Sequence, residues 1–516
     1  MLLTGLPIRR PPGFAVRWLS IFSVSLGLFG VRFGVPGPVG QADNRDGPRL
    51  MCGPGLGLGP VFPHGDPRYF RYAYFAYAPS RSCAHLPTYP SSELVPLQLA
   101  RWLTPVLRLP GTLNLIALGV LMCVAASVGI ASLATGLRLR LPAQVLLAGA
   151  LWLIMADAAF FDVFASPFSE PAALIGLLLV AAGVVYLGRG WRATLAGLAL
   201  AGPGGFLVIG SKEQYVILAA PICLTLVLAS ADRDRARARL GRYRTRQTVA
   251  AAAVAVLLAG VAGGYLLWDN ASPYAARLHH EQAVDMIFDD IVTGSDHAAA
   301  DLRALGLPVS WARYAGDWYW KNVSVRNDPL YPRYEAKLTD GNIAHFLLTH
   351  PGRAISIGQQ AAVLAQRYRV SSLGDYPPSA GQRAGAIDSR EVVLTWLMHR
   401  LPSGLGLLWL LPLWTAMAAV SAVALTRRRG EAWLRDAAAA AACLTGCAVA
   451  AFIPPAYFAG ISTTRHMVGM NLATALGGTL TVALALSLIR RHRAGRRSGA
   501  TCPGAAGRLT FAKLSR

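Results

Sequence analysis

Long apolar blocks separated by short charged turns dominate the pattern of this 516-residue chain. The apolar residues run continuously instead of recurring once per helical turn, which is typical of helices that face lipid. Most blocks have roughly the 17 to 25 residues that a helix needs to cross a bilayer. The pattern therefore predicts an all-α polytopic membrane protein. Its ten expected spans are about Trp18–Val35, Thr112–Leu137, Leu141–Phe161, Pro171–Leu187, Ala193–Gly210, Tyr215–Ala231, Thr248–Trp268, Gly404–Leu425, Trp433–Ile453 and Met467–Ile489.

Two longer polar stretches interrupt the blocks and are expected to be extracytoplasmic. The first apolar run is either a retained signal anchor or a cleaved signal peptide, and we favour the anchor because the next loop needs one. Leu94–Leu109 is expected to be a helix lying flat on the membrane, and Ala275–Val292 an amphipathic helix. The expected divisions are 1–35 (first span), 36–110 (first outer loop), 111–268 (spans two to seven), 269–401 (second outer loop), 402–489 (spans eight to ten) and 490–516 (basic tail).

The basic residues indicate the orientation of the chain. With the N-terminus inside, the inner turns hold Arg138 and Arg140, then Arg189 and Arg192, and later the run Arg427 to Arg429. The short outer turns hold only Lys212 and Arg465. Ten spans with both termini cytoplasmic satisfy the positive-inside rule at every short turn, whereas an odd number would break it.

Composition agrees with a membrane location. Hydrophobic residues make up 54% of the chain, charged residues only 15%, and the mean hydropathy is +0.42. A soluble chain carries about 25% charged residues. The net charge of +23 could suggest a nucleic-acid partner. We reject that partner because the basic residues concentrate in short turns between apolar blocks and in the tail, where they meet membrane lipids. The excess of arginine over lysine is typical of a bacterium with a GC-rich genome.

The absence of two sequence motifs narrows the range of reactions that the protein could catalyse. The sequence has no GxxxxGK[ST] loop and no dinucleotide fingerprint, so we expect no nucleotide partner. A group donor used on the outer face must then be carried on a lipid. Cys52 and Cys83 share the first outer loop, where an oxidising compartment would allow a disulfide. Two free thiols remain the alternative.

Ionisable residues next to the apolar blocks gather on the predicted outer side, where such groups are costly and often functional. Each also has a structural explanation, as a turn residue, a mutually neutralised pair or an interfacial anchor. Rows of aromatic rings could stack on sugars or form an interfacial belt. The ionisable candidates are His64, Asp66, Arg68, Arg71, Asp162, Glu170, Lys212, Glu213, Arg465 and His466; the aromatic ones are Tyr69, Phe70, Tyr72, Tyr74, Phe75, Tyr77, Trp311, Tyr314, Trp318, Tyr319 and Trp320.

These stretches resemble the GT-C class of integral-membrane glycosyltransferases, especially bacterial glycan-biosynthesis hexosyltransferases. Many members of that class have paired acids in the first outer loop. This sequence has a lone Asp66 there, with Asp43 and Asp46 nearer the first span. The stretches that carry the likeness are His64-Gly-Asp-Pro-Arg-Tyr-Phe-Arg71, Tyr89-Pro-Ser-Ser-Glu93, Phe161-Asp-Val-Phe-Ala-Ser-Pro-Phe-Ser-Glu170, Ser211-Lys-Glu-Gln-Tyr215, His350-Pro-Gly-Arg353 and Arg465-His466.

The resemblance implies transfer of a hexose from a polyprenyl-phosphate sugar to a glycan or lipid acceptor, with inversion at the anomeric carbon. No metal or other cofactor is then required, although the carboxylates leave a divalent ion open. Asp66 would be the general base. The donor phosphate would be held by Arg68, Arg71, Lys212 and Arg465, and the substrates contacted by His64, Asp162, Glu170, Glu213 and His466.

Two other functions stay open. A transporter or lipid flippase would need a polar site near the middle of the membrane, whereas the charged residues here lie at the outer rim. A non-catalytic partner in envelope polymer assembly would leave the outer acids and bases scattered. A shared outer cavity containing Asp66, Asp162, Glu170, Lys212 and Arg465 would favour the enzyme.

Overall fold

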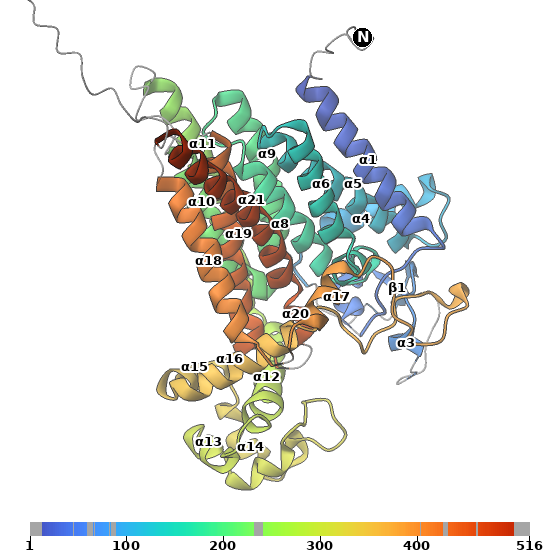
Figure 1. Cartoon of the computed structure of the whole chain (residues 1–516). Helices are drawn as coiled ribbons and strands as arrows, with labels where there is room; N and C mark the ends of the chain where they lie inside the picture. The colour runs from blue at the N-terminus through green and yellow to red at the C-terminus, as the bar shows by residue number, and fades with distance from the viewer. Residues whose placement is uncertain are drawn as a thin grey trace, which may run out of the picture.

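A bundle of long apolar helices forms the body of the protein, and the connecting segments gather at one end of it (Figure 1). A computed structural model describes residues 13–44, 46–58, 66, 68–81, 83, 89–231, 241–402, 404–426, 432–460 and 463–499. The all-α membrane class is confirmed, because every expected span falls on a helix. The bundle helices are α1 (Phe14–Gly34), α5 (Leu115–Gly136), α6 (Leu141–Ala156), α7 (Ala158–Phe161), α8 (Glu170–Val184), α9 (Trp191–Ile209), α10 (Ala219–Ala231), α11 (Gly241–Ala271), α18 (Leu407–Thr426), α19 (Ala432–Tyr457) and α21 (Val468–Gly499).

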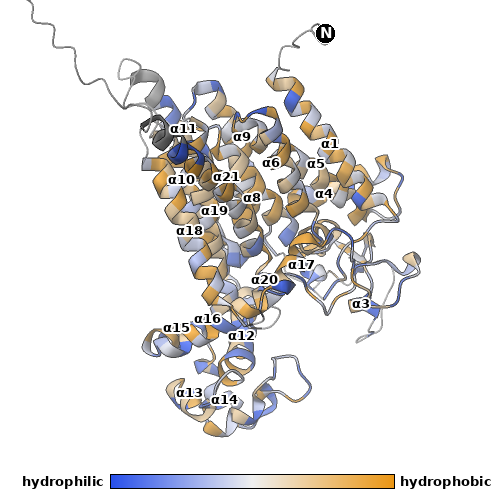
Figure 2. Ribbon diagram, viewed as in Figure 1, coloured by the Kyte–Doolittle hydropathy of each residue, from blue (hydrophilic) through white to orange (hydrophobic). Residues whose placement is uncertain are grey.

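Eight of the described spans are long and apolar enough to cross a membrane by themselves. The ribbons of the bundle helices are coloured hydrophobic over much of their length (Figure 2). The third expected span is not one straight helix. It breaks at Asp157, and the segment that follows turns by 58°. The Asp157 carboxylate causes the break by accepting hydrogen bonds from the backbone N–H groups of Ala159 and Leu394, which caps α7 and anchors the distant helix α17 (Val393–Arg400).

The fourth expected span, α8, has only 15 residues and lies almost wholly inside the bundle. It packs tightly on α9 because glycines face each other across the pair. A Cβ atom on Gly183 would meet the carbonyl oxygen of Gly197 at 2.4 Å, and one on Gly176 would meet that of Gly204 at 2.5 Å. Small residues let membrane helices approach this closely. The N-terminus of α8 is thereby fixed at the end of the bundle where the loops gather.

The first outer loop contains a small antiparallel sheet that the sequence analysis did not expect. Its strands are β1 (Leu56–Leu58), β2 (Ala76–Pro79) and β3 (Leu113–Asn114), paired in the order β1-β2-β3. Alternating burial before and along β2 places Ala73, Phe75 and Tyr77 inward, so the last two rings are not available to stack on a sugar. Three helices complete the loop: α2 (Gly47–Met51), α3 (Arg68–Arg71) and α4 (Leu94–Val106), the last being the expected interfacial helix.

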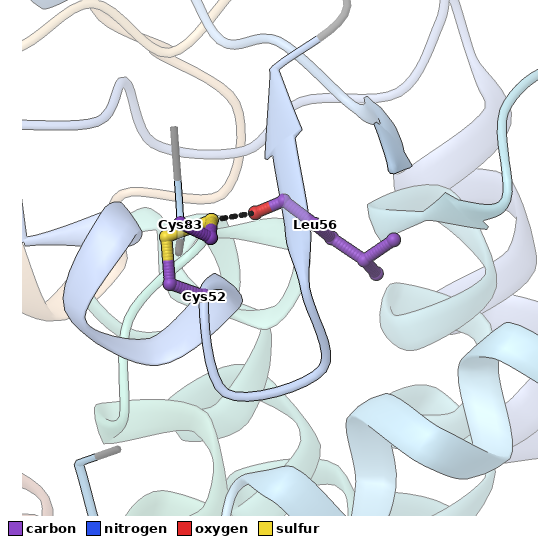
Figure 3. The surroundings of a disulfide bond; sticks show 3 residues. All are labelled: Cys52, Leu56 and Cys83. Atoms are coloured by element: carbon purple, nitrogen blue, oxygen red, sulfur yellow. Dashed lines mark hydrogen bonds between the residues drawn. A yellow bond between two sulfur atoms is a disulfide. The ribbon is translucent and has the colours of Figure 1, made fainter. Parts of the chain in front are cut away.

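A disulfide closes this loop. Cys52, directly after α2, is joined to Cys83 beside β1, and the second sulfur also lies 3.4 Å from the carbonyl oxygen of Leu56 (Figure 3). The alternative of two free thiols is therefore wrong for this structure. Disulfides persist in oxidising compartments outside the cytoplasm. The bond supports the predicted outer location of the loop.

The second outer segment forms a lobe beyond the end of the bundle (Figure 1). The expected amphipathic helix is present, but it becomes a π-helical turn from Met286 to Val292; Val284, Ile287, Phe288 and Ile291 point inward as predicted, and Leu278 is only half-buried. The lobe has its own apolar core, which includes the fully buried Trp311. Its helices are α12 (Pro273–Asp285), α13 (Ala298–Ala304), α14 (Tyr331–Tyr334), α15 (Asp340–Thr349) and α16 (Pro351–Ala365).

A candidate anion site at the outer end of the bundle

Three segments that are far apart in sequence meet at the end of the bundle where the loops gather. The Gly40 and Ala42 amides donate to the carbonyl oxygens of Asp375 and Gly374, and the Ala73 amide donates to that of Tyr376. The loop after α16 therefore runs between the start of the first outer loop and the strand that leads into β2. This meeting places charged side chains from all three segments next to the broken third span.

The first charged group is centred on Asp162. Its carboxylate accepts from Arg32 of α1 at 3.3 Å and from Arg369 at 3.0 Å. Arg369 also binds Asp375, and Arg32 lies 2.6 Å from Asp388. All five side chains are mostly buried. The network ties α1 and the broken span to the loop after α16.

Burial acts differently on the two loop carboxylates of this network. Burial raises the pKa of Asp375 to about 6, because the attraction of Arg369 only partly offsets the loss of solvent. Burial would also raise the pKa of Asp388, but Arg32 and Arg390 outweigh it and hold that pKa below its usual range. Asp375 therefore takes up a proton more readily than Asp388.

The second charged group is centred on Arg465, in the short helix α20 (Thr463–His466) before α21. Its guanidinium binds the Asp46 carboxylate and lies 3.7 Å from Glu170 at the N-terminus of α8. Glu170 in turn lies 3.4 Å from the Lys212 ammonium. Burial alone would raise the pKa of Asp46, but Arg465, Arg49 and Lys212 lower it well below its usual range. Asp46 is therefore ionised and held by cations.

Arg465 has hydrogen-bonding capacity to spare. Its side chain is only 6% exposed and lies over the Phe168 ring at 4.8 Å. Among the residues that the structure describes, its Nε and Nη1 atoms have no hydrogen-bond partner. Buried donors left unpaired cost free energy, so these two atoms are available to a water molecule or to a ligand.

His466 and Glu213 border this group. Burial lowers the pKa of His466 well below its usual range, with help from Lys212 and Arg465, so this ring is neutral. It lies 3.1 Å from Arg465 through Nε2. Glu213, next to Lys212, accepts a hydrogen bond of 2.6 Å from the Tyr89 hydroxyl. His466 therefore contacts Arg465 directly, whereas Glu213 is held by tyrosines.

The N-terminus of α8 receives a second carboxylate. Glu93, at the start of α4, accepts a 2.6 Å hydrogen bond from the Ala172 amide. Burial raises the pKa of Glu93 well above its usual range, and neighbouring Glu170 raises it further. Glu170 rather than Glu93 forms the contact with Lys212.

A cavity of about 20 Å³ joins the two charged groups. It has room for about one water molecule, so a sugar phosphate can enter only if side chains around it move. A larger groove of about 330 Å³ begins at the same place, because Tyr368 lines both. The groove is walled by α17, α18 and α21 and is mostly apolar. Its lining includes Leu394, Met398, Trp409, Leu413, Ala475 and Val482; the cavity's includes Gln41, Asp162, Glu170, Arg369, Asp375 and Arg465.

The structure brings together some of the predicted site residues. Asp162, Glu170 and Arg465 line the cavity, and Lys212 and His466 contact residues that line it. Glu213 follows Lys212 in the chain but binds Tyr89 instead. The arrangement shows which ionisable residues are neighbours and leaves their roles as predictions.

The Asp66 stretch lies to one side of this cavity. Asp66 is bound by Arg68 at 2.6 Å, and that arginine side chain is 63% exposed. The Arg71 carbonyl accepts from the Gly385 amide, and its side chain is exposed. None of these three residues is among the described residues that line the cavity. His64 lies outside the described residues.

Sequence reasoning missed Arg32, Arg49, Arg369 and Asp375 and did not select Asp46. One signal was readable, because Arg32 is an ionisable residue inside the first apolar run. The others sit in irregular segments, where no periodicity indicates which side chains meet.

One comparison with known proteins gives a match. The family model described as the YfdI N-terminal transmembrane domain matches residues 15–465, from α1 to α20. No curated protein and no solved structure matches the chain.

Proposed function

The chain belongs to the YfdI N-terminal transmembrane domain family, and from this membership and its anion site we propose that it is a membrane glycosyltransferase. It would move a hexose from a polyprenyl-phosphate donor to a glycan or lipid acceptor on the outer face of the cytoplasmic membrane. The observation that carries the proposal is the buried Arg465 in the small cavity, where two of its donor atoms have no hydrogen-bond partner among the described residues, next to a groove of mostly apolar side chains that shares Tyr368 with the cavity.

The two hollows match the two halves of such a donor. Arg465 and Lys212 would hold the phosphate by charge-assisted hydrogen bonds, and the groove between α17, α18 and α21 would take the start of the isoprenoid chain. Tyr368, which lines both hollows, would mark the junction between headgroup and chain. Asp162 and Asp375, at the other side of the small cavity, would orient sugar hydroxyls. The donor phosphate would replace Asp46 as the partner of Arg465.

The proposed reaction is a single displacement. A carboxylate takes the proton of the acceptor hydroxyl, the acceptor oxygen bonds to the anomeric carbon, and the bond from that carbon to the phosphate oxygen breaks. The lipid phosphate leaves with the electron pair and is stabilised by Arg465 and Lys212. Asp66 is the base that the sequence suggests. Asp46 is the first-loop carboxylate that lies at Arg465, and donor binding would release it for this role.

The test is transfer by the full chain in lipid nanodiscs, using radiolabelled polyprenyl-phosphate hexoses and an acceptor fraction from cell envelopes. We expect Arg465→Ala to lower the transfer rate by about 10²–10³-fold, as loss of a transition-state donor does. Exposed Arg303 on α13 provides the matched control, Arg303→Ala. Absence of transfer with every lipid donor refutes the enzyme and leaves a lipid flippase or an assembly partner.

Two further variants assign the base. Replacement of the catalytic base by the corresponding amide should lower the transfer rate by about 10²–10⁴-fold. Asp66→Asn and Asp46→Asn are compared with Asp296→Asn, an exposed aspartate in the lobe. Full activity in Asp66→Asn removes the base that the resemblance implies. Full activity in both variants shows that neither Asp66 nor Asp46 is the base.

A further inference from the structure

Two tryptophans of the lobe are exposed although the lobe has a well-formed core. Trp318 is 42% exposed and Trp320 is 51% exposed, whereas Trp311, a few residues earlier, is fully buried. Val323 on the same loop is 69% exposed. Residues 317–323 therefore present a small apolar surface that the folding of the lobe leaves uncovered.

The Trp320 ring is held in a fixed position. Its Nε1 donates to Glu281 of α12 at 3.1 Å, and the guanidinium groups of Arg277 and Arg326 lie 5.5 and 5.0 Å from its centre. Arg277 also binds Glu281 at 2.9 Å. A ring that is fixed before a ligand arrives loses little conformational entropy when it binds.

The neighbouring rings are fixed in a similar way. Lys321 lies 5.5 Å from the centre of Trp318, and Tyr319 packs edge-on against Trp320 at 5.1 Å. The Tyr319 amide donates to Asp285 at the end of α12. The loop therefore holds its half-exposed aromatic rings in fixed positions, with carboxylate and guanidinium groups beside them.

Contacts through α12 connect this loop to the chain that leads into the anion site. Gly460, three residues after α19 and five residues before Arg465, packs directly on Asp285, the residue that holds Tyr319. The aromatic loop and the anion site are therefore connected through the end of α12 and the segment that follows α19.

We propose that the 317–323 loop, together with Glu281 and Arg277, is a saccharide-binding subsite for the sugar acceptor. This proposal rests on the proposed function. A pyranose ring has an apolar face of C–H groups and hydroxyls at its edge. Half-exposed indoles match the face, and the carboxylate and guanidinium groups beside them match the hydroxyls. A membrane-surface belt would need none of these fixed contacts, and the lobe projects beyond the end of the bundle (Figure 1).

The experiment measures saccharide binding to the full chain in nanodiscs without donor. The probes are linear hexasaccharides of glucose, mannose and rhamnose and the polysaccharide that mild acid releases from envelopes of the native cells. We expect at least one probe to bind, and Trp318→Ala and Trp320→Ala each to weaken it by about tenfold or more. Trp320→Phe, which keeps a ring but loses the N–H, should weaken binding less than Trp320→Ala.

Matched controls separate binding from folding and from lipid contact. Trp396→Ala removes a similarly exposed tryptophan from α17, which packs on the bundle, and should leave saccharide affinity unchanged. Unfolding temperatures show whether each variant is folded. Nanodiscs of brominated phosphatidylcholine should quench the emission of Trp396 but not that of Trp318 and Trp320. Quenching of the two loop tryptophans would assign them to the membrane surface and overturn the proposal.

The outcomes also separate this proposal from the proposed function. If no probe binds, or if binding survives both tryptophan replacements, the saccharide subsite is refuted whatever the transfer assay gives. If a saccharide binds through the tryptophans but no hexose is transferred, the enzyme is refuted and the subsite stands. Arg465→Ala should abolish transfer and leave saccharide affinity unchanged.

Discussion

At the scale of single residues, the pairing of Arg465 with Asp46 is an ion pair whose loss should be measurable as a change in stability. Both charges are taken largely out of water, and such pairs are costly to break from one side. We expect Arg465→Met to lower the free energy of unfolding by about 3–5 kcal/mol, because Asp46 and Glu170 lose their buried cation. The double variant Arg465→Met/Asp46→Asn should lose less than the sum of the two single variants, by about 1–3 kcal/mol.

Reversible unfolding in detergent measures this coupling. Arg313→Met with Asp328→Asn is a suitable control cycle, since that pair binds at 2.5 Å but its arginine is 60% exposed. Exposed pairs contribute little, so the control coupling should stay below about 1 kcal/mol. Additive effects of Arg465→Met and Asp46→Asn would mean that the two side chains do not interact.

The sequence allowed the site to be predicted only in part, and the residues show why. Glu170, Lys212 and Arg465 stand next to apolar blocks, where an ionisable side chain is conspicuous. Asp375 and Arg369 stand in a polar loop, where charged residues are ordinary. Their place is set by contacts over long sequence distances, such as that from the Gly40 amide to the Asp375 carbonyl. No periodicity or spacing encodes such a contact.

At the scale of elements, His279 joins the lobe to the bundle. From α12 it contacts Asp340 at the start of α15 at 3.0 Å and Asp269 at the end of α11 at 2.9 Å. The bond to Asp340 is the larger cause that raises the pKa of His279 to about 9, against the opposing effect of burial. The protonated ring thus bridges two carboxylates on different helices.

This bridge predicts a pH dependence. Because the folded pKa lies above the unfolded value of about 6.5, the stabilisation is complete below pH 6.5 and is lost as pH rises through about 9. The unfolding temperature of His279→Gln should therefore lie below that of the wild type at pH 6 and approach it at pH 10. His345→Gln, which alters an exposed histidine on α15, is the control. A gap of equal size at both pH values would show that the ring stabilises by packing alone.

Elements were easier to foresee than their details. Long apolar blocks predicted every bundle helix, because lipid leaves a spanning backbone no other way to satisfy its hydrogen bonds. The break at Asp157 was not predicted, since it depends on amides of α17 more than 230 residues away in the chain. The short sheet was also missed, because a row of aromatic residues hides the alternation of buried and exposed positions around Phe75 and Tyr77.

At the scale of the whole molecule, the lobe, α17 and α20 lie at one end of the bundle, and the start of α1 lies at the other (Figure 1). The arginine-rich turns predict that the end of the bundle at which α1 begins faces the cytoplasm. The Cys52–Cys83 disulfide is typical of an oxidising compartment, so it predicts that the first outer loop lies outside the cytoplasm. Two unrelated properties, charge and redox chemistry, thus favour the same orientation.

Cysteine labelling in intact cells tests this orientation. Ser379→Cys lies on the exposed loop after α16, and Arg140→Cys on an exposed turn before α6. A membrane-impermeant maleimide should label Ser379→Cys in intact cells and Arg140→Cys only after the membrane is opened. An even number of expected spans lies between the N-terminus and Arg140, so Arg140 should be cytoplasmic. An odd number lies between the N-terminus and Ser379, so Ser379 should be outside. The parent chain, whose Cys52 and Cys83 are joined, should gain outer label only after a reductant. Labelling of Arg140→Cys from outside would show that the protein has the opposite orientation, with Arg465 and Lys212 on the cytoplasmic side. A donor carried on the outer leaflet would then have no support.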